Sequence, residues 1–265
     1  MKNELEFYDG IKNWDFSTIK YIEENLTDWD LYKILNDFAL PNYKILDLGT
    51  GGGEKVLKNF PIVKEIIATD FSKEMINTAN ENLAKTKRQD ITFKQMDNLN
   101  MSTPNDYFDM VVARHTCIDA NGIYKTLKIG GKLLLRGVDK LDCWQLKKLY
   151  GKGQAFKDDK PISLIDYENI LDAGFKNVEL VPIHIREYYK TKDDLLALLL
   201  KTPILSDFSE IEENNYNNND KINMSLLDKY IQENTSEKER NTLNKPFTTL
   251  NFLNLLVMTT PLEKN

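Results

Sequence analysis

One short stretch limits what this chain can fold into more than any other. The segment ILDLGTGGGEKVL, residues 45–57, is an apolar run interrupted by Asp47, after which four of the chain's 12 glycines fall within five residues. A strand followed at once by a glycine-rich turn and a helix suits a nucleotide-like ligand, because the missing Cβ atoms let the ligand approach backbone N–H groups. The stretch therefore predicts a ligand-binding strand–turn–helix unit.

Around this unit, short apolar runs alternate with charged helical segments. We predict strands at 44–49, 65–70, 91–96, 108–113, 132–137, 178–185 and 247–260, and helices at 73–87, 141–150 and 164–173. Such alternation is typical of parallel strands joined by right-handed helical crossovers. The expected fold class is α/β, a three-layer α/β/α sandwich with a seven-stranded, mostly parallel sheet and a mainly helical cap.

Both ends of the chain depart from this alternation. Residues 1–43 place apolar side chains at spacings of three and four, which predicts an N-terminal helical segment packing over the ligand site. Two helical patterns and a polar loop separate the predicted strand at 178–185 from the last one. We therefore expect a ligand-binding core over 44–187, a helical insertion or cap over 188–245, and a last strand within 246–265 that returns to the core sheet.

The composition narrows the classes of partner. A formal net charge of −6 disfavours a general nucleic-acid binder, whose affinity usually comes from a basic face. With two cysteines and two histidines, the chain is not expected to hold a metal. Its longest apolar runs are too short to span a bilayer and no signal sequence is visible, so we expect a cytoplasmic protein without a membrane partner.

Read from its acid, the glycine segment is D-x-G-x-G-x-G, formed by Asp47, Gly49, Gly51 and Gly53. It resembles the first motif of the class I S-adenosylmethionine-dependent methyltransferases, a family with a Rossmann-like fold. The dinucleotide pattern G-x-G-x-x-G fits less well, because Glu54 stands where its third glycine should be. Four further segments resemble the later motifs of the family in the right order: IIATDFSKEM (66–75), FKQMDNLNM (93–101), YFDMVVARHTC (107–117) and LKIGGKLLLRG (127–137).

The resemblance implies S-adenosylmethionine as the cofactor and gives roles to particular residues. Asp70 would accept both ribose hydroxyls, since one carboxylate offers two acceptor oxygens. Asp97 would face the adenine amino group. Arg114 would contact the cofactor carboxylate, the surroundings of the adenine or an acidic substrate, and the sequence does not choose among these. The implied cofactor-binding residues are Asp47, Gly49, Thr50, Gly51, Gly53, Asp70, Phe71, Met75, Met96, Asp97, Asn98 and Arg114.

The acceptor side is less well defined by the sequence. His115 follows the fourth motif, where the transferred methyl group should point, and an ordinary pKa of about 6.5 would suit a catalytic base. A structural histidine beside Arg114 explains the residue equally well. Trp14, Tyr188 and Tyr189 are expected to line the substrate pocket, with ordinary aromatic packing as the alternative.

These features predict methyl transfer to a small-molecule acceptor by in-line displacement. Two alternatives remain open. An RNA or protein methyltransferase would draw a basic surface from KTKR (85–88) and KKLYGKGQAFK (147–157). A non-catalytic nucleotide-binding module, or a nicotinamide-dependent enzyme on a similar fold, would use the glycine turn without methyl transfer.

Overall fold

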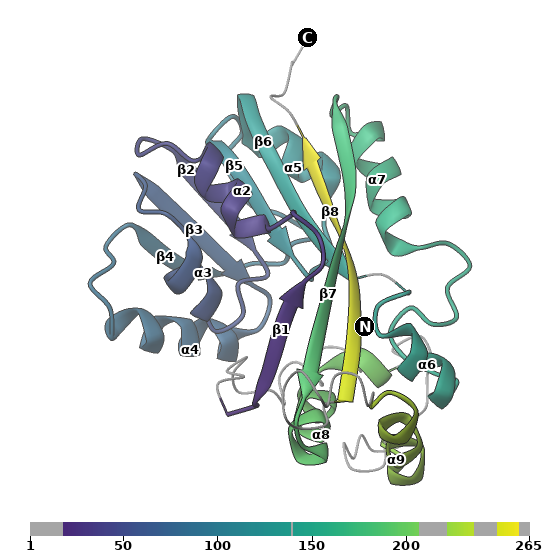
Figure 1. Ribbon diagram of the computed structural model, residues 1–265. Helices are drawn as coiled ribbons and strands as arrows, with labels where there is room; N and C mark the ends of the chain where they lie inside the picture. The colour runs from purple at the N-terminus through teal and green to yellow at the C-terminus, as the bar shows by residue number, and fades with distance from the viewer. Residues whose placement is uncertain (1–17, 139, 207–221, 236–247, 260–265) are drawn as a thin grey trace.

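The strands predicted around the glycine segment lie in one mixed sheet. The computed structural model describes residues 18–138, 140–206, 222–235 and 248–259, and within these ranges eight strands are ordered β1-β7-β8-β6-β5-β2-β3-β4 (Figure 1). Neighbours among β6, β5, β2, β3 and β4 are parallel, whereas β8, β7 and β1 pair antiparallel. The strands are β1 (Tyr21–Asn25), β2 (Lys44–Leu48), β3 (Glu65–Asp70), β4 (Ile91–Gln95), β5 (Phe108–Arg114), β6 (Leu127–Val138), β7 (Val178–Tyr189) and β8 (Thr248–Thr259).

Helices cover both faces of the sheet (Figure 1). Apolar side chains of α2, α3 and α4 pack with one face of the central strands, and those of α5 and α7 pack with the other face. No helix in the described ranges is long and apolar enough to cross a bilayer. The helices are α2 (Leu31–Phe38), α3 (Glu54–Asn59), α4 (Lys73–Ala84), α5 (Ala120–Thr126), α6 (Trp144–Tyr150), α7 (Ile162–Asp172), α8 (Lys192–Lys201), the 3₁₀ turn η1 (Pro203–Leu205) and α9 (Met224–Glu233).

The N-terminal segment differs from the helical prediction. Residues 21–25 form strand β1, which pairs with residues 185–189 of β7, and only α2 is helical in the described part of this segment. The glutamate-rich stretch has a helical pattern, but the open edge of β7 offers it backbone partners, and this tertiary pairing prevails over local propensity. The predicted count of seven strands is therefore short by β1.

The C-terminal part adds a last strand and a group of helices. Strand β8 lies in the sheet between β7 and β6. Helices α6, α8 and α9 contribute to one apolar cluster with Tyr189, so they gather around one end of the β7–β8 pair (Figure 1). Strand β7 ends at Tyr189, two residues beyond the predicted core boundary, and the cap helix α8 begins at Lys192.

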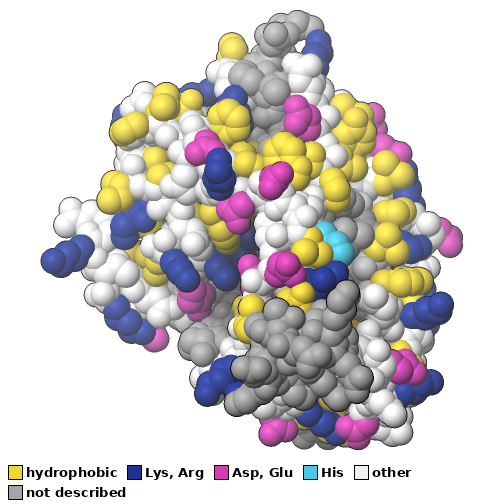
Figure 2. Space-filling model, viewed as in Figure 1, with side chains coloured by type: hydrophobic (Ala, Val, Ile, Leu, Met, Phe, Trp, Pro, Cys, Tyr) yellow, Lys and Arg dark blue, Asp and Glu magenta, His cyan; other side chains and the backbone are white. Residues whose placement is uncertain are grey.

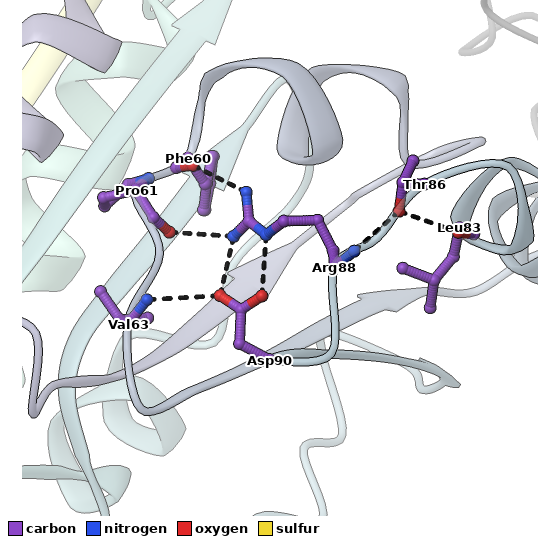
Figure 3. Close-up of polar contacts among 7 residues, drawn as sticks. All are labelled: Phe60, Pro61, Val63, Leu83, Thr86, Arg88 and Asp90. Carbon is purple, nitrogen blue, oxygen red and sulfur yellow. Dashed lines mark hydrogen bonds and ion pairs between the residues drawn. The ribbon is translucent and has the colours of Figure 1, made fainter.

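A polar cluster fixes the connections before β3 and β4 (Figure 3). Arg88 holds both Asp90 carboxylate oxygens, at 2.7 and 2.8 Å, and also donates to the carbonyls of Phe60 and Pro61 at 3.0 and 2.9 Å. The Val63 N–H completes the set by donating to Asp90 at 3.3 Å. Burial alone would raise the pKa of the Asp90 carboxyl, but these hydrogen bonds lower it overall. The cluster therefore ties two loops together at the amino ends of the strands.

Replacing Arg88 tests how much this cluster stabilises the fold. Because the Arg88 and Asp90 side chains are only 14% and 11% exposed, Arg88→Met should lower the free energy of unfolding by about 2–4 kcal/mol. The Asp90 pKa is depressed, so its contribution exists above its ordinary pKa of 3.8 and is lost as the pH falls through the folded value. Urea denaturation at pH 7 and below pH 3.8 measures both effects.

The matched control is Lys33→Met, which breaks an exposed pair with Asp37. Because both side chains are exposed, this variant should leave the free energy of unfolding almost unchanged. Equal losses in the two variants would show that the Arg88 cluster is an ordinary surface ion pair.

Candidate functional site

The glycine segment forms the turn between β2 and α3. The N–H groups of Gly49 and Thr50 donate to the Thr69 carbonyl at 2.9 and 2.8 Å, which fixes the turn against β3. Gly53 has a φ of +78°, and a Cβ at this position would lie 2.6 Å from Phe93 Cζ. Position 53 therefore requires glycine both for its left-handed backbone and for the close approach of the turn to β4.

Asp70 ends β3 beside this turn. One of its carboxylate oxygens accepts the Gly51 N–H, and the other accepts the Ser72 N–H, both at 2.9 Å. Ser72 caps α4 by accepting the Met75 N–H at 3.3 Å. The structure thus brings the predicted ribose carboxylate into contact with the predicted glycine turn, at the carboxyl ends of adjacent parallel strands.

The third motif lies directly after β4. The Met96 N–H donates to the Asp70 carbonyl at 3.0 Å, and Asp97 is exposed at the start of a turn. Asn98 is 7% exposed and donates to the Thr116 hydroxyl at 2.9 Å. Asn98 therefore joins the loops after β4 and β5, which is a structural contribution to the site edge.

Two apolar candidates differ sharply in exposure. Phe71 is 50% exposed at the end of β3, so its ring has free surface for a ligand. Met75 is 1% exposed in α4, so its side chain has almost none. The placement of Met75 therefore favours core packing over the predicted contact with the cofactor. Met96 is partly buried against the apolar cluster on the opposite face.

Asp47 is the most unusual group at this edge. It lies on the central strand β2, is 1% exposed, and its Oδ2 atom has no hydrogen-bond partner among the described residues. Thr50 Oγ1 and the Tyr32 hydroxyl are also buried without a well-formed hydrogen bond to the described residues, although Thr50 lies close enough to Asp47 to lower the pKa of its carboxyl. Burial raises the pKa of Asp47 to about 7, although the nearby Arg114 charge opposes the shift. Buried polar atoms are nearly always paired, so these three point to a missing ligand or solvent.

Cationic side chains gather beside Asp47. Arg114 ends β5, is the register partner of Arg136 on β6, and lies with its Cζ 6.0 Å from the centre of the Tyr32 ring. Lys55 of α3 is close enough for its charge and those of both arginines to depress the pKa of His115. This group of Lys55, Arg114 and Arg136, which we call the cationic cluster, lies on the face covered by α2 and α3.

His115 adjoins the cationic cluster. Its φ is +53°, and its N–H donates to the Arg136 carbonyl at 2.9 Å. His115 is an exposed residue at the carboxyl end of β5. Desolvation of the imidazole by the neighbouring protein, together with the positive charges of Arg136, Arg114 and Lys55, holds the pKa of His115 well below 6.5. The imidazole is therefore neutral at pH 7 and a weak base, which disfavours the predicted role as a general base in the ligand-free protein.

The predicted aromatic pocket residues do not lie together. Tyr188 and Tyr189 are neighbours on β7, so their side chains point to opposite faces. Tyr188 donates to Glu24 at 2.6 Å, whereas Tyr189 donates to Glu187 and stacks on Tyr21. At most one of them can line a given pocket. Trp14 lies outside the described residues.

Several residues of the site were missed from the sequence. Tyr32, Lys55 and Arg136 all lie near Asp47 or His115. Arg136 had a usable signal, because it is a charge at the end of an apolar strand, as Asp70 is. Tyr32 and Lys55 carry no such signal, since each is one polar residue within a helix. No group of three or more metal-ligating side chains occurs among the described residues.

Comparison with known proteins identifies the family. Residues 40–178, just over half of the chain, match the model of a family described as a methyltransferase domain. The chain belongs to this methyltransferase family, whose methyl donor is S-adenosylmethionine. The recognition made from the five motifs is confirmed.

Individual relatives are more distant. An uncharacterized Bacillus subtilis methyltransferase, YcgJ, is 26% identical over 92 residues, which cover 35% of this chain and 36% of the relative. Ribosomal protein L11 methyltransferase of Listeria welshimeri is 28% identical over 111 residues, or 40% and 35% of the two chains. The chain thus spans about a third of the length of these curated relatives.

A third relative has another kind of acceptor in its name. Ubiquinone/menaquinone biosynthesis C-methyltransferase of Vibrio vulnificus is 26% identical over 133 residues, which cover 46% of this chain and 51% of the relative.

Solved structures support the fold. A structure from Bacillus halodurans matches with a TM-score of 0.56 at 19% identity. The match covers 88% of this chain and 99% of the Bacillus halodurans chain. The structure of Bacillus subtilis YcgJ has a TM-score of 0.53 at 18% identity, with coverage of 88% and 98%. The Rossmann-like methyltransferase fold is therefore shown, although its sheet here is not the expected seven-stranded one.

The close approach at Gly53 gives a sharp stability test. Gly53→Ala should destabilise the protein by about 1–3 kcal/mol more than Gly130→Ala, because both positions have a left-handed φ but only Gly53 meets a neighbour. Gly130 has nothing within 4 Å of the added Cβ. Urea denaturation of both variants measures the difference, and equal losses would refute the close packing of the turn on Phe93.

Asp47 should lower the stability of the ligand-free protein. Its folded pKa of about 7 exceeds its ordinary value of 3.8, so ionisation favours the unfolded state and stability falls as the pH rises between these values. Asp47→Asn removes this effect and should raise the free energy of unfolding by about 1–3 kcal/mol at pH 8, and by less at pH 4.5. Denaturation at both pH values tests this; a variant less stable than wild type at pH 8 would contradict it.

Proposed function

We propose that this protein transfers a methyl group from S-adenosylmethionine to a small-molecule acceptor. The observation that carries the proposal is the convergence of a glycine turn, the Asp70 carboxylate and the unpartnered oxygens of Asp47 and Thr50. They meet at the carboxyl ends of parallel strands, the edge at which open α/β sheets bind ligands. Family membership supplies the identity of the methyl donor.

The residues suit both ends of this cofactor. Asp70 offers two adjacent oxygens to a ribose diol, since a carboxylate oxygen that accepts one backbone N–H can accept a second hydrogen bond. Asp47 would accept from the amino group, and Arg114 would pair with the carboxylate. The exposed Phe71 ring and Asp97 would face the adenine.

The chain itself would contribute position more than acid–base chemistry. When bound, S-adenosylmethionine supplies a methyl group on a positively charged sulfur that leaves as a neutral thioether. Holding an acceptor in line and excluding water can account for much of the acceleration. His115, with its depressed pKa, would position the acceptor through its neutral ring.

Two cations of the basic segments named for RNA binding are engaged or buried within the protein. Arg88 of the KTKR segment is committed to Asp90 and two carbonyls, and Lys147 of the second segment is completely buried. On the face shown in Figure 2, Lys and Arg side chains are interspersed with Asp and Glu. These observations support a small acceptor over RNA.

The surroundings of the cationic cluster support a covered acceptor pocket. Burial raises the pKa of Glu187 on β7 to about 7, with Glu23 of β1 and Lys55 also acting on its charge. We therefore propose that the N-terminal segment, within 1–43, and the cap, within 188–245, close over the acceptor side. We also propose a cytoplasmic location, since Cys117 and Cys143 do not form a disulfide with each other.

Calorimetric titration with S-adenosylhomocysteine tests the cofactor site. Wild-type protein should bind it in preference to NADH, and Asp70→Asn should weaken binding about tenfold or more because a charged acceptor is lost. Asp109→Asn is the matched control, since Asp109 also accepts a backbone N–H, that of Lys44 at 2.7 Å, but at the opposite sheet edge.

Each other outcome has a definite meaning. Equal weakening in both variants would show a general effect on folding, and preferential binding of NADH would refute the methyltransferase proposal. Salt-dependent RNA binding in a gel shift would overturn the small-molecule acceptor.

A further inference from the structure

The cationic cluster contains more positive charge than the cofactor can use. Arg114 and Arg136 are paired in register on adjacent parallel strands, which lie only about 4.8 Å apart. They share one face of the sheet, because Val112 and Leu134, two residues before each, belong to the core under α2 and α3. Two guanidinium groups are thus attached side by side at the carboxyl edge.

Lys55 adds a third charge from above this face. It lies in the first turn of α3, and its amine forms no ion pair or hydrogen bond among the described residues. Burial lowers the pKa of Lys55, and the charges of Arg114 and Arg136 lower it further. The three cations are therefore near enough to repel one another.

Neighbouring acids offset this charge only in part. Glu23 and Asp142 favour the charged form of Arg136, yet burial and Arg114 outweigh them and its pKa is lowered. At His115, the charges that act on the ring are those of three cations, Arg136, Arg114 and Lys55. The surroundings of His115 are thus electropositive.

The cofactor does not neutralise the positive charge of the cationic cluster. S-adenosylmethionine has one carboxylate, but its ammonium and sulfonium leave it with a net positive charge. One carboxylate occupies one guanidinium, which leaves the remaining cations without a cofactor partner.

From this geometry, and resting on the proposed function, we infer that the methyl acceptor carries an oxyanion, a carboxylate or a phosphate, held by Arg136 and Lys55 beside His115. Arg114 serves the cofactor's carboxylate. The guanidinium fork suits both oxyanions, since it donates two parallel hydrogen bonds, and Lys55 adds a mobile point charge. An anion here also raises the basicity of His115.

The two histidines make this directly measurable by NMR. Protein saturated with S-adenosylhomocysteine is titrated with inorganic phosphate, and separately with acetate, while the imidazole signals are followed. At least one anion should raise the pKa of His115 in a saturable manner and leave His184 as the reference. His184→Gln assigns the signals.

Charge-removing variants locate the anion. Arg136→Gln and Lys55→Gln should each weaken its binding about tenfold or more. The control Lys64→Gln removes another exposed lysine, which lies before β3, and should have no effect. Unchanged affinity for S-adenosylhomocysteine in all three shows that the variants are folded.

The outcomes separate this inference from the proposed function. If S-adenosylhomocysteine itself does not bind, the proposed function fails. If S-adenosylhomocysteine binds but neither anion changes the pKa of His115, only the acceptor inference is overturned. The same holds if the Arg136 and Lys55 variants bind the anion as wild type does. Displacement of phosphate by S-adenosylhomocysteine would also overturn it, because the cluster would then serve the cofactor carboxylate alone. A response to phosphate only, or to acetate only, identifies which oxyanion the acceptor carries.

Discussion

The site depends on a carboxylate that folding buries without fully satisfying it. Asp47 lies on β2, between β3 and β5 in the centre of the sheet, so water cannot reach it easily. Desolvation raises its pKa to about 7, and Oδ2 has no partner in the described part of the chain. A positively charged amino group of a ligand would stabilise the ionised carboxylate and would donate the missing hydrogen bond to Oδ2. The glycine turn, Thr50 and Arg114 are placed around this one strand end.

The amino and carboxyl ends of the parallel strands, called the amino edge and the carboxyl edge here, differ in how fully their polar groups are paired. At the amino edge, Arg88 and Asp90 satisfy one another and the loop carbonyls around them. At the carboxyl edge, Asp47 and Thr50 keep unpartnered oxygens, and Arg114 and Arg136 lie side by side. A site poised for a ligand commonly lowers stability, which well-paired regions elsewhere offset. We interpret the contrast as a division between a stabilising edge and a binding edge.

The sequence predicted the features that depend on residues close together in the chain. The glycine turn, the acid ending β3 and the alternation of strands and helices follow from residue type and spacing over short stretches. Strand β1 could not be predicted in this way, because residues 21–25 become a strand only by pairing with residues 185–189. The same distant pairing separates Tyr188 from Tyr189, and the register of β5 with β6 brings Arg136 beside Arg114. The residue roles proposed for the cofactor stay predictions.

The central claim is that the amino group of the cofactor completes the Asp47 site. The most direct test is the number of protons released when S-adenosylhomocysteine binds at pH 7, obtained by calorimetry in two buffers of different ionisation enthalpy. Since burial keeps part of the Asp47 population protonated at that pH, ionising it on binding should release a fraction of a proton in wild type and none in Asp47→Asn. Binding with no proton release, or the same release in both proteins, would contradict the account.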